Sequence, residues 1–147
     1  MQVRVQQENF DFGDECARFA AAREDTGAVV TFCGIVRAPA AGVLHRMEIE
    51  HYPGMTERAI AQIAQTALTR WNLTDCLVIH RYGTLLPGER IMMVATASRH
   101  RADAFAAADF LMDYLKSRAP FWKKEITDQG ADWVAAKDAD EEALARW

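Results

Sequence analysis

Two long segments with the apolar spacing of helices constrain the fold of this chain more than any other feature. The first spans residues 51–71, and the second begins at Arg99–Arg101 and ends before Pro120, which bars a helix from continuing. Apolar residues recur at three- and four-residue intervals in both: Ile60, Ile63, Ala64, Ala67, Leu68 and Trp71 in the first, and Phe105, Ala108, Met112 and Leu115 in the second. Because such stripes face a core, each helix is expected to cover another layer.

Short segments rich in β-branched and aromatic residues surround these helices. Strands are predicted at residues 3–5, 27–37, 44–52, 75–83 and 90–98, with a terminal hairpin in residues 121–136 that turns at Asp-Gln-Gly. A helix is expected at residues 13–24 with Asp14 as its cap, a loop at 38–43, a turn at 85–89, and a polar tail at 137–147 that is helical or partly mobile. This order predicts an α+β fold, a mostly antiparallel sheet packed on helices, in a single domain of residues 1–147.

Composition excludes several classes of protein. Half of the 147 residues are apolar and the net charge is -4, which argues against nonspecific nucleic-acid binding and requires any anion site to be local. We expect no signal peptide and no membrane span, since no apolar run approaches about 20 residues. The three cysteines form no CxxC pair, so neither disulfides nor a metal site are expected and a reducing cytoplasm is the predicted location.

Against this acidic background, positive charge gathers in two places near the end of the chain. Residues 116–125 read KSRAPFWKKE, and Arg99, His100 and Arg101 stand where a strand gives way to a helix. Cations at a helix N-terminus form an anion pocket together with the free backbone N–H groups. A solvated basic loop explains the same charges, and the position of Lys116 in the last helical turn is favoured by the helix dipole alone.

Lys123 is less easily explained by its position alone. On a strand it shares one face with Phe121 and Glu125, while Trp122 and Lys124 lie on the other. A lysine among rings and other cations can have a lowered pKa, which suits it to act as a base or nucleophile.

Four other residues receive structural interpretations. Arg37 stands at the end of a predicted strand, and a lone arginine at such a position is usually a surface residue. His51 and His80 alternate with apolar neighbours and are predicted to be core histidines. No motif surrounds Cys33, so it is interpreted as a small buried strand residue.

Five motifs in this order resemble the large, catalytic subunit of molybdopterin synthase: EHYPGM, VIHRYG, LLPGE, ASRHR and MDYLKSRAPFWKKE. The resemblance extends from GAVVTFCGIVR to ADWVAA and includes the closing ARW. It implies an α/β hammerhead fold with a small added β subdomain. It also implies conversion of cyclic pyranopterin monophosphate to molybdopterin with sulfur from the thiocarboxylate at the Gly-Gly C-terminus of a ubiquitin-like partner. The implied assembly is a heterotetramer around a homodimer of the large subunit, with no bound cofactor or metal.

The resemblance also implies roles for individual residues. Lys116 and Lys123 are the expected catalytic residues. Lys116 is expected to be the principal acid/base, with a transient covalent link to the partner's C-terminus, and Lys123 is expected to position the substrate and stabilise developing charge. The other expected substrate contacts are Ile35, Val36, Arg37, His100, Arg101, Lys124 and Glu125. Pro120 is expected to bring the two lysines to opposite walls of one pocket, with Phe121 and Trp122 anchoring the strand.

One segment departs from the family pattern, and three alternatives remain open. Residues Ala38–Gly42 replace a loop that is commonly polar in the family, so its role in substrate binding is unassigned. The first alternative is a non-catalytic paralogue that only docks the ubiquitin-like tail. The second is an unrelated enzyme that forms a Schiff base on a lysine, and the last, disfavoured by net charge, is a nucleic-acid binder.

Overall fold

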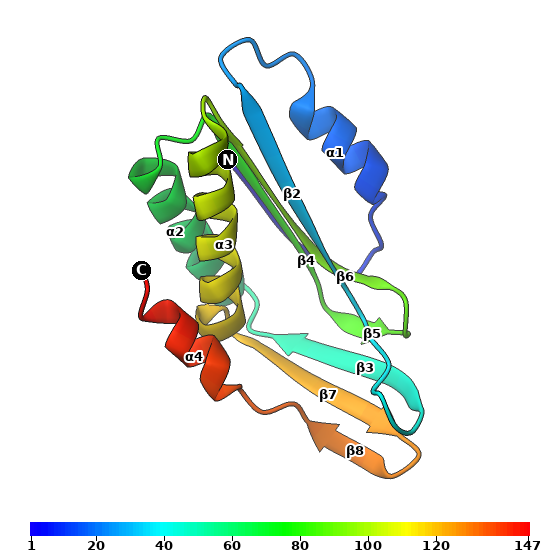
Figure 1. Cartoon of the computed structure of the whole chain (residues 1–147). Coiled ribbons are helices and arrows are strands. Elements are labelled where there is room, and N and C mark those ends of the chain that lie inside the picture. The colour runs from blue at the N-terminus through cyan, green and yellow to red at the C-terminus, as the bar shows by residue number, and fades with distance from the viewer.

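A computed structural model describes residues 1–147 as four helices and eight strands (Figure 1). In chain order they are β1 (Gln2–Gln6), α1 (Phe12–Ala20), β2 (Ala28–Ile35), β3 (Leu44–His51), α2 (Met55–Arg70), β4 (Asp75–Arg81), β5 (Gly83–Leu85), β6 (Arg90–Ser98), α3 (Arg101–Arg118), β7 (Phe121–Thr127), β8 (Gly130–Trp133) and α4 (Asp138–Leu144). None of the helices combines the length and apolar character needed to cross a membrane.

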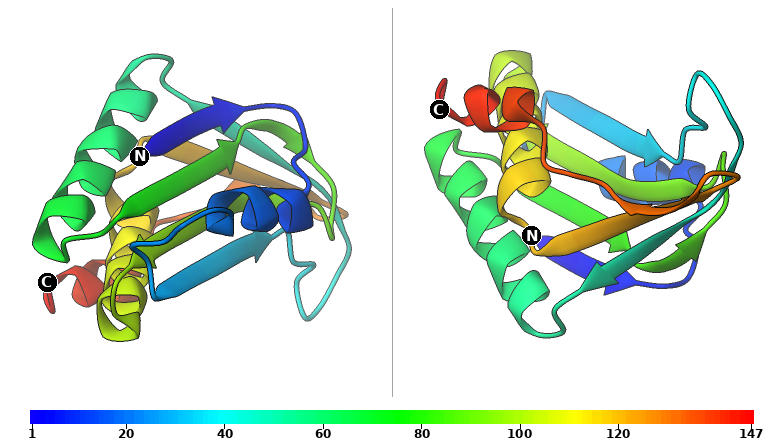
Figure 2. Two further views of the ribbon diagram at one scale, coloured as in Figure 1. Left: turned by 90° about the horizontal axis from the view of Figure 1, so that it is seen from above. Right: turned by 90° about the horizontal axis from the view of Figure 1, so that it is seen from below.

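Four strands in the order β1-β4-β6-β2 form the larger sheet, which carries the main core. The β1–β4 pair is parallel, and the other two pairs are antiparallel. Helices α2 and α3 cover one face and α1 covers the other (Figure 1), while Figure 2 shows β1 and β2 at the two edges. Because β4 and β6 are covered on both faces, they are buried along nearly their whole length and read as continuous apolar runs.

Small residues allow α2 and α3 to lie close to each other and to the sheet. Ala64 and Ala67 of α2 and Ala107 of α3 are fully buried, beside Phe110 and Leu111. Alanine fills little space, so the two helices approach closely without leaving voids, and the larger side chains interdigitate around them. The predicted stripe of α2 is confirmed.

The smaller sheet, in the order β5-β3-β7-β8, extends from the end of the larger one. Its inner face buries Val36, Leu44, Met47, Ile49 and Leu85 in a separate small core. All three strand pairs are antiparallel, and the predicted terminal hairpin is confirmed as β7 and β8. The two sheets and their helices confirm the expected α+β fold.

Several local predictions were wrong. The N-cap of α1 is Asp11, whose carboxylate accepts from the Asp14 backbone N–H at 2.9 Å, so Asp14 lies inside the helix. Phe105 is 63% exposed because the buried stripe of α3 runs through Ala104, Ala107 and Leu111 instead. Strand β5 was missed because three residues are too few to show alternation.

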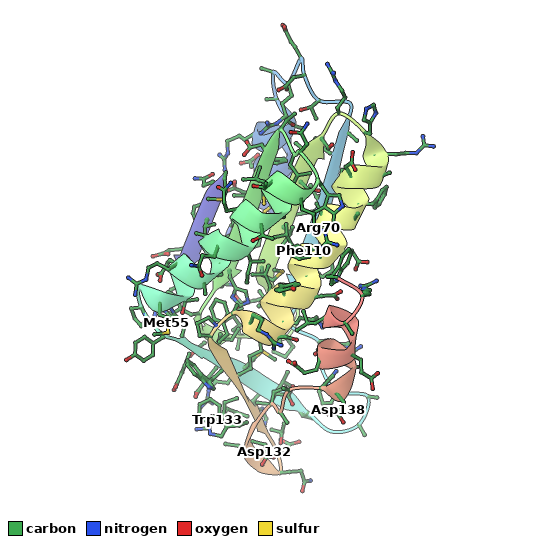
Figure 3. All side chains as sticks on the ribbon, turned by 90° about the vertical axis from the view of Figure 1, so that its left-hand side faces the viewer. Met55, Arg70, Phe110, Asp132, Trp133 and Asp138 are labelled. Atoms are coloured by element: carbon green, nitrogen blue, oxygen red, sulfur yellow. The ribbon has the colours of Figure 1, made fainter.

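The polar tail is helical and fastened to α3. Trp147 packs against Trp71 and Phe110 with ring centroids 5.6 Å away, and its indole N–H donates to Asp113 at 2.6 Å. The Arg70 side chain, which lies beside Phe110 in Figure 3, donates to the Trp147 carbonyl at 2.8 Å. Trp147 therefore covers the apolar residues that α2 and α3 share on this side of the main core.

We predict that Trp147→Ala lowers the free energy of unfolding by about 2 kcal/mol, because it removes a half-buried indole and its hydrogen bond. Trp133→Ala is the matched control, since Trp133 is 54% exposed, and should cost less than about 1 kcal/mol. Urea unfolding followed by circular dichroism measures both. Equal losses in the two variants would contradict the packing role of Trp147.

Candidate active site

The junction between α3 and β7 brings two lysines together. Lys116 lies in the last turn of α3, Pro120 follows the helix, and Lys123 is on the strand that begins at once with Phe121. The Lys116 side chain is 51% exposed, and its Nζ lies 3.8 Å from Oδ1 of Asp140. Lys123 points to the inner face of the smaller sheet, opposite Ile49.

Burial changes the acid–base character of Lys123. Loss of hydration is the main cause of its lowered pKa, and the positive charge of Lys116 lowers this pKa further, while the Asp140 carboxylate partly opposes both effects. A buried amine with a lowered pKa gives up its proton more readily than an exposed lysine. Lys123 therefore has the character of a general base or nucleophile.

Aromatic rings and two histidines pack behind Lys123. His80 stacks on Phe121 with ring centroids 3.7 Å apart, and its Nδ1 lies 2.8 Å from the Arg81 carbonyl oxygen. Burial, assisted by the charge of Lys123, lowers the pKa of His80 to about 3, so the ring is neutral at physiological pH. His51 packs on Tyr82 with centroids 4.2 Å apart. The prediction of a core histidine is confirmed for His80, while His51 is half-buried.

Trp122 does not anchor the strand as predicted. It lies on the outer face of β7 and is 49% exposed, because only the inner face of the smaller sheet packs on a core. Phe121 alone is packed, between the main core and the smaller one. Behind it, the Oγ1 of buried Thr56 donates to the Tyr52 carbonyl at 2.9 Å and lies 3.5 Å from the Pro120 carbonyl oxygen.

A groove of about 660 Å³ runs between the edge strand β2 and helix α3 and ends at Lys116 and Asp140. Phe32, Phe105 and Met112 make its walls largely apolar. Since β2 is the last strand of its sheet, one row of its backbone groups has no strand partner. Lys123 is not part of the wall. The groove thus suits an extended segment whose end meets the Lys116 amine.

The predicted anion-binding pair lies far from the lysines in the same chain. Arg101 begins α3 and His100 caps it, whereas Lys116 is in its last turn. The helix has 18 residues, which at about 1.5 Å per residue separates its two ends by about 27 Å. One chain therefore does not unite His100 and Arg101 with Lys116 and Lys123.

The remaining predicted residues are spread over the lysine end of the molecule. Ile35 and Arg37 are exposed at the end of β2. Val36 between them is buried in the smaller core, and its backbone N–H and C=O already bond to Glu89 and Gly88.

On β7, the two residues after Lys123 face opposite ways. Lys124 lies on the outer face, where its Nζ is 5.4 Å from the ring centroid of Trp133. Glu125 shares the inner face with Lys123, opposite Met47.

Two features of the site had no usable signal in the sequence. Asp140 belongs to the polar tail, and nothing near it in the chain indicates that it meets Lys116. The groove wall combines residues from β2 and α3 that only packing brings together. For Cys33, burial raises the pKa of the thiol, which does not favour a nucleophilic thiolate. No set of three or more His, Cys, Asp or Glu side chains is placed to hold a metal ion.

Comparison with known proteins identifies the family. Residues 5–118 match the family model described as MoaE protein. The chain belongs to the MoaE family. It is 67% identical over its whole length to the full-length molybdopterin synthase catalytic subunit of Cereibacter sphaeroides.

Solved MoaE structures share the fold. The molybdopterin biosynthesis MoaE protein of Burkholderia ambifaria is 49% identical, with a TM-score of 0.84 over 99% of this chain and 97% of that one. A complex of subunits 1 and 2 of molybdopterin-converting factor from Helicobacter pylori contains a chain with a TM-score of 0.74, covering 92% of this chain and 90% of that one. At 18% identity, this last likeness concerns the fold alone.

We predict that His80 makes the protein sensitive to acid. Above pH 6.5 the ring is neutral in both states, whereas between pH 6.5 and about 3 only the unfolded chain takes up the proton, so stability falls as the pH falls. Between pH 7 and 4.5 this residue should account for a loss of about 2–3 kcal/mol. Urea unfolding of wild type and of His80→Phe at both pH values tests this. Equal pH-dependent losses in the two proteins would contradict it.

Proposed function

We propose that the chain is the catalytic subunit that converts cyclic pyranopterin monophosphate to molybdopterin, with sulfur from the C-terminal thiocarboxylate of a ubiquitin-like partner. The observation that carries this proposal is Lys116 at the end of a groove, with the buried Lys123 at the same α3–β7 junction, in a chain of the MoaE family. The names of its relatives support the same activity. A reducing cytoplasm is the proposed location, which agrees with three unpaired cysteines.

The groove supports docking of the partner's tail. A Gly-Gly terminus has no side chains, so it fits between the walls formed by Phe32 and Met112 and can bond to the free edge of β2 as an added strand. Its negatively charged end would then meet the Lys116 ammonium. The Helicobacter pylori protein of the same fold is known in a complex of subunits 1 and 2 of molybdopterin-converting factor.

The two lysines differ in ways that support different roles. Opening of the cyclic phosphate and loss of the substrate oxygen both need proton transfer. Burial and the charge of Lys116 favour Lys123 as the amine that accepts a proton. Exposure in the groove favours Lys116 as the group that meets the tail and stabilises its charge. The role of Lys116 as principal acid/base stays a prediction. Substitution of each lysine by arginine distinguishes an acid/base role of Lys116 from one of Lys123.

We further propose that a second copy of the chain supplies the phosphate-binding group. His100 and Arg101 are exposed at the far end of α3 from Lys116, so a site that uses all of them requires two chains. A symmetric dimer would form two such composite sites. Arg37 at the end of β2 lies on the lysine side and would add a charge-assisted contact to the same substrate.

We predict that Lys123→Arg abolishes product formation, because arginine keeps its proton. Lys116→Arg should retain part of the activity if Lys116 acts through its charge. Lys137→Arg is the matched control, since Lys137 is exposed and is not among the expected site residues. The assay mixes each protein with thiocarboxylated carrier and cyclic pyranopterin monophosphate, and detects molybdopterin as its oxidised fluorescent derivative.

Each outcome of this assay favours one interpretation. Full inactivation by Lys116→Arg with an active Lys123→Arg protein would restore Lys116 as the acid/base. Carrier binding without product in the wild-type protein would favour the non-catalytic paralogue. Neither binding nor product would overturn the proposed function.

We predict that two inactive variants complement each other. Mixing Lys116→Ala with the double variant His100→Ala, Arg101→Ala should restore activity after the subunits exchange, because one site of each mixed dimer contains only intact residues. Random exchange leaves roughly a quarter of the sites intact. Activity no higher than that of the separate variants would contradict a site shared between two chains.

A further inference from the structure

Asp140 is the acidic member of the lysine junction, and the proposed mechanism does not use it. Its carboxylate lies 3.8 Å from Lys116 Nζ and lines the same end of the groove. It also acts electrostatically on Lys123. It lies in α4, beyond the residues 5–118 that match the family model, and in no motif that indicated function.

Several contacts hold Asp140 in place from both sides. The Ser117 hydroxyl donates to the Asp140 carbonyl at 3.2 Å, and Arg118 forms a bidentate pair with Glu141 at 2.8 and 3.1 Å. At the other end of α4, Arg146 pairs with Asp113 at 2.7 Å and with Asp109 at 2.9 Å. These contacts hold the backbone of α4 against α3, so the fold places Asp140 beside Lys116.

The other charged groups around the junction are already engaged or lie elsewhere. The carboxylates of Asp109 and Asp113, which also line the groove, pair with Arg146. Glu125 shares the inner face of β7 with Lys123 and lies opposite Met47. Among the basic groups, Arg118 pairs with Glu141 and Lys124 lies over Trp133 on the outer face.

His80, which packs behind the lysines, adds no positive charge to the junction. This ring on β4 faces Phe121 and is neutral at physiological pH, and His51 on β3 packs against Tyr82. The Asp140 carboxylate therefore contacts one of the two amines, Lys116, and acts electrostatically on the other, Lys123. Removing that carboxylate leaves two like charges that repel each other.

We propose that Asp140 is a positioning residue for this pair, holding the Lys116 ammonium at the end of the groove and limiting its repulsion of Lys123. The inference rests on the proposed function for its catalytic consequence, but its electrostatic part is independent of any reaction. In the intact protein the carboxylate orients Lys116 towards the groove end. At the same time its negative charge offsets the repulsion between the two amines.

The sign of the effect on Lys123 follows from the contacts. Asp140 raises the pKa of Lys123 against the lowering by burial and by Lys116. Loss of the carboxylate should therefore lower the pKa of Lys123 further. If Lys123 is the base of the reaction, the acid limb of the rate profile moves to lower pH by the same amount, while misplacement of Lys116 lowers kcat/KM.

Three variants separate this role from a general effect of α4. Asp140→Asn removes the charge and keeps the shape, and Asp140→Glu restores the charge. Asp138→Asn is the matched control, because Asp138 lies at the start of α4 (Figure 3), in the same first helical turn as Asp140, and is exposed. It therefore reproduces any effect on the helix dipole.

The first measurement is a titration of the lysines by NMR in protein with labelled lysine side chains. The chain has only four lysines, Lys116, Lys123, Lys124 and Lys137, so single Lys→Arg variants assign every signal. In Asp140→Asn the pKa of Lys123 should fall by roughly 0.5–1 unit. Asp138→Asn should leave the pKa of Lys123 as in wild type, and Asp140→Glu should restore most of the wild-type pKa.

The second measurement is the rate of molybdopterin formation against pH. Asp140→Asn should lower kcat/KM about tenfold through misplacement of Lys116, with the acid limb shifted down, and Asp140→Glu should recover much of the loss. Unchanged titration of Lys123 in a folded Asp140→Asn protein would overturn the inference. If wild type forms no product, the proposed function fails, yet the titration still decides whether Asp140 governs the lysines.

Discussion

The end of helix α3 is the constraint on which the candidate site depends. Proline at position 120 cannot continue the helix, so α3 ends at Arg118, two residues after Lys116, and β7 starts at Phe121. Because Phe121 stacks on His80 in the buried face of the larger sheet, the start of β7 is held against the main core. A short reversal thereby places one lysine at the surface of a groove and the next on the buried face of a strand.

This arrangement gives two chemically similar side chains different properties. Lys116 is half exposed and contacts a carboxylate, whereas Lys123 is dehydrated and close to a second positive charge. A lysine in water and a lysine against rings differ in how readily they release a proton, because burial disfavours the charged form. Burying a cation without a full partner costs stability, a cost that folded proteins commonly carry at sites of chemistry.

The architecture also explains why one chain offers only part of a site. Helix α3 connects the two basic regions, with His100 and Arg101 at its start and Lys116 at its end. A rigid helix cannot bring its own ends together, so the same element that separates these groups in one chain makes a second chain necessary for the proposed composite site. The C-terminal helix has the opposite effect, because its packing on α3 delivers Asp140 to the lysine end.

Local pattern alone determined the helix stripe of α2, the antiparallel hairpin at the end of the chain, the stop at Pro120 and the family motifs around Lys116 and Lys123, since each depends on residues close together in the chain. Only tertiary packing decided that Phe105 and Trp122 are exposed, that Lys123 is buried, and that Asp140 meets Lys116. Those outcomes depend on which faces of α3 and β7 are covered by other elements of the chain, and on contacts between residues far apart in sequence. Periodicity reports that a segment has an apolar face, but burial is a property of what covers it.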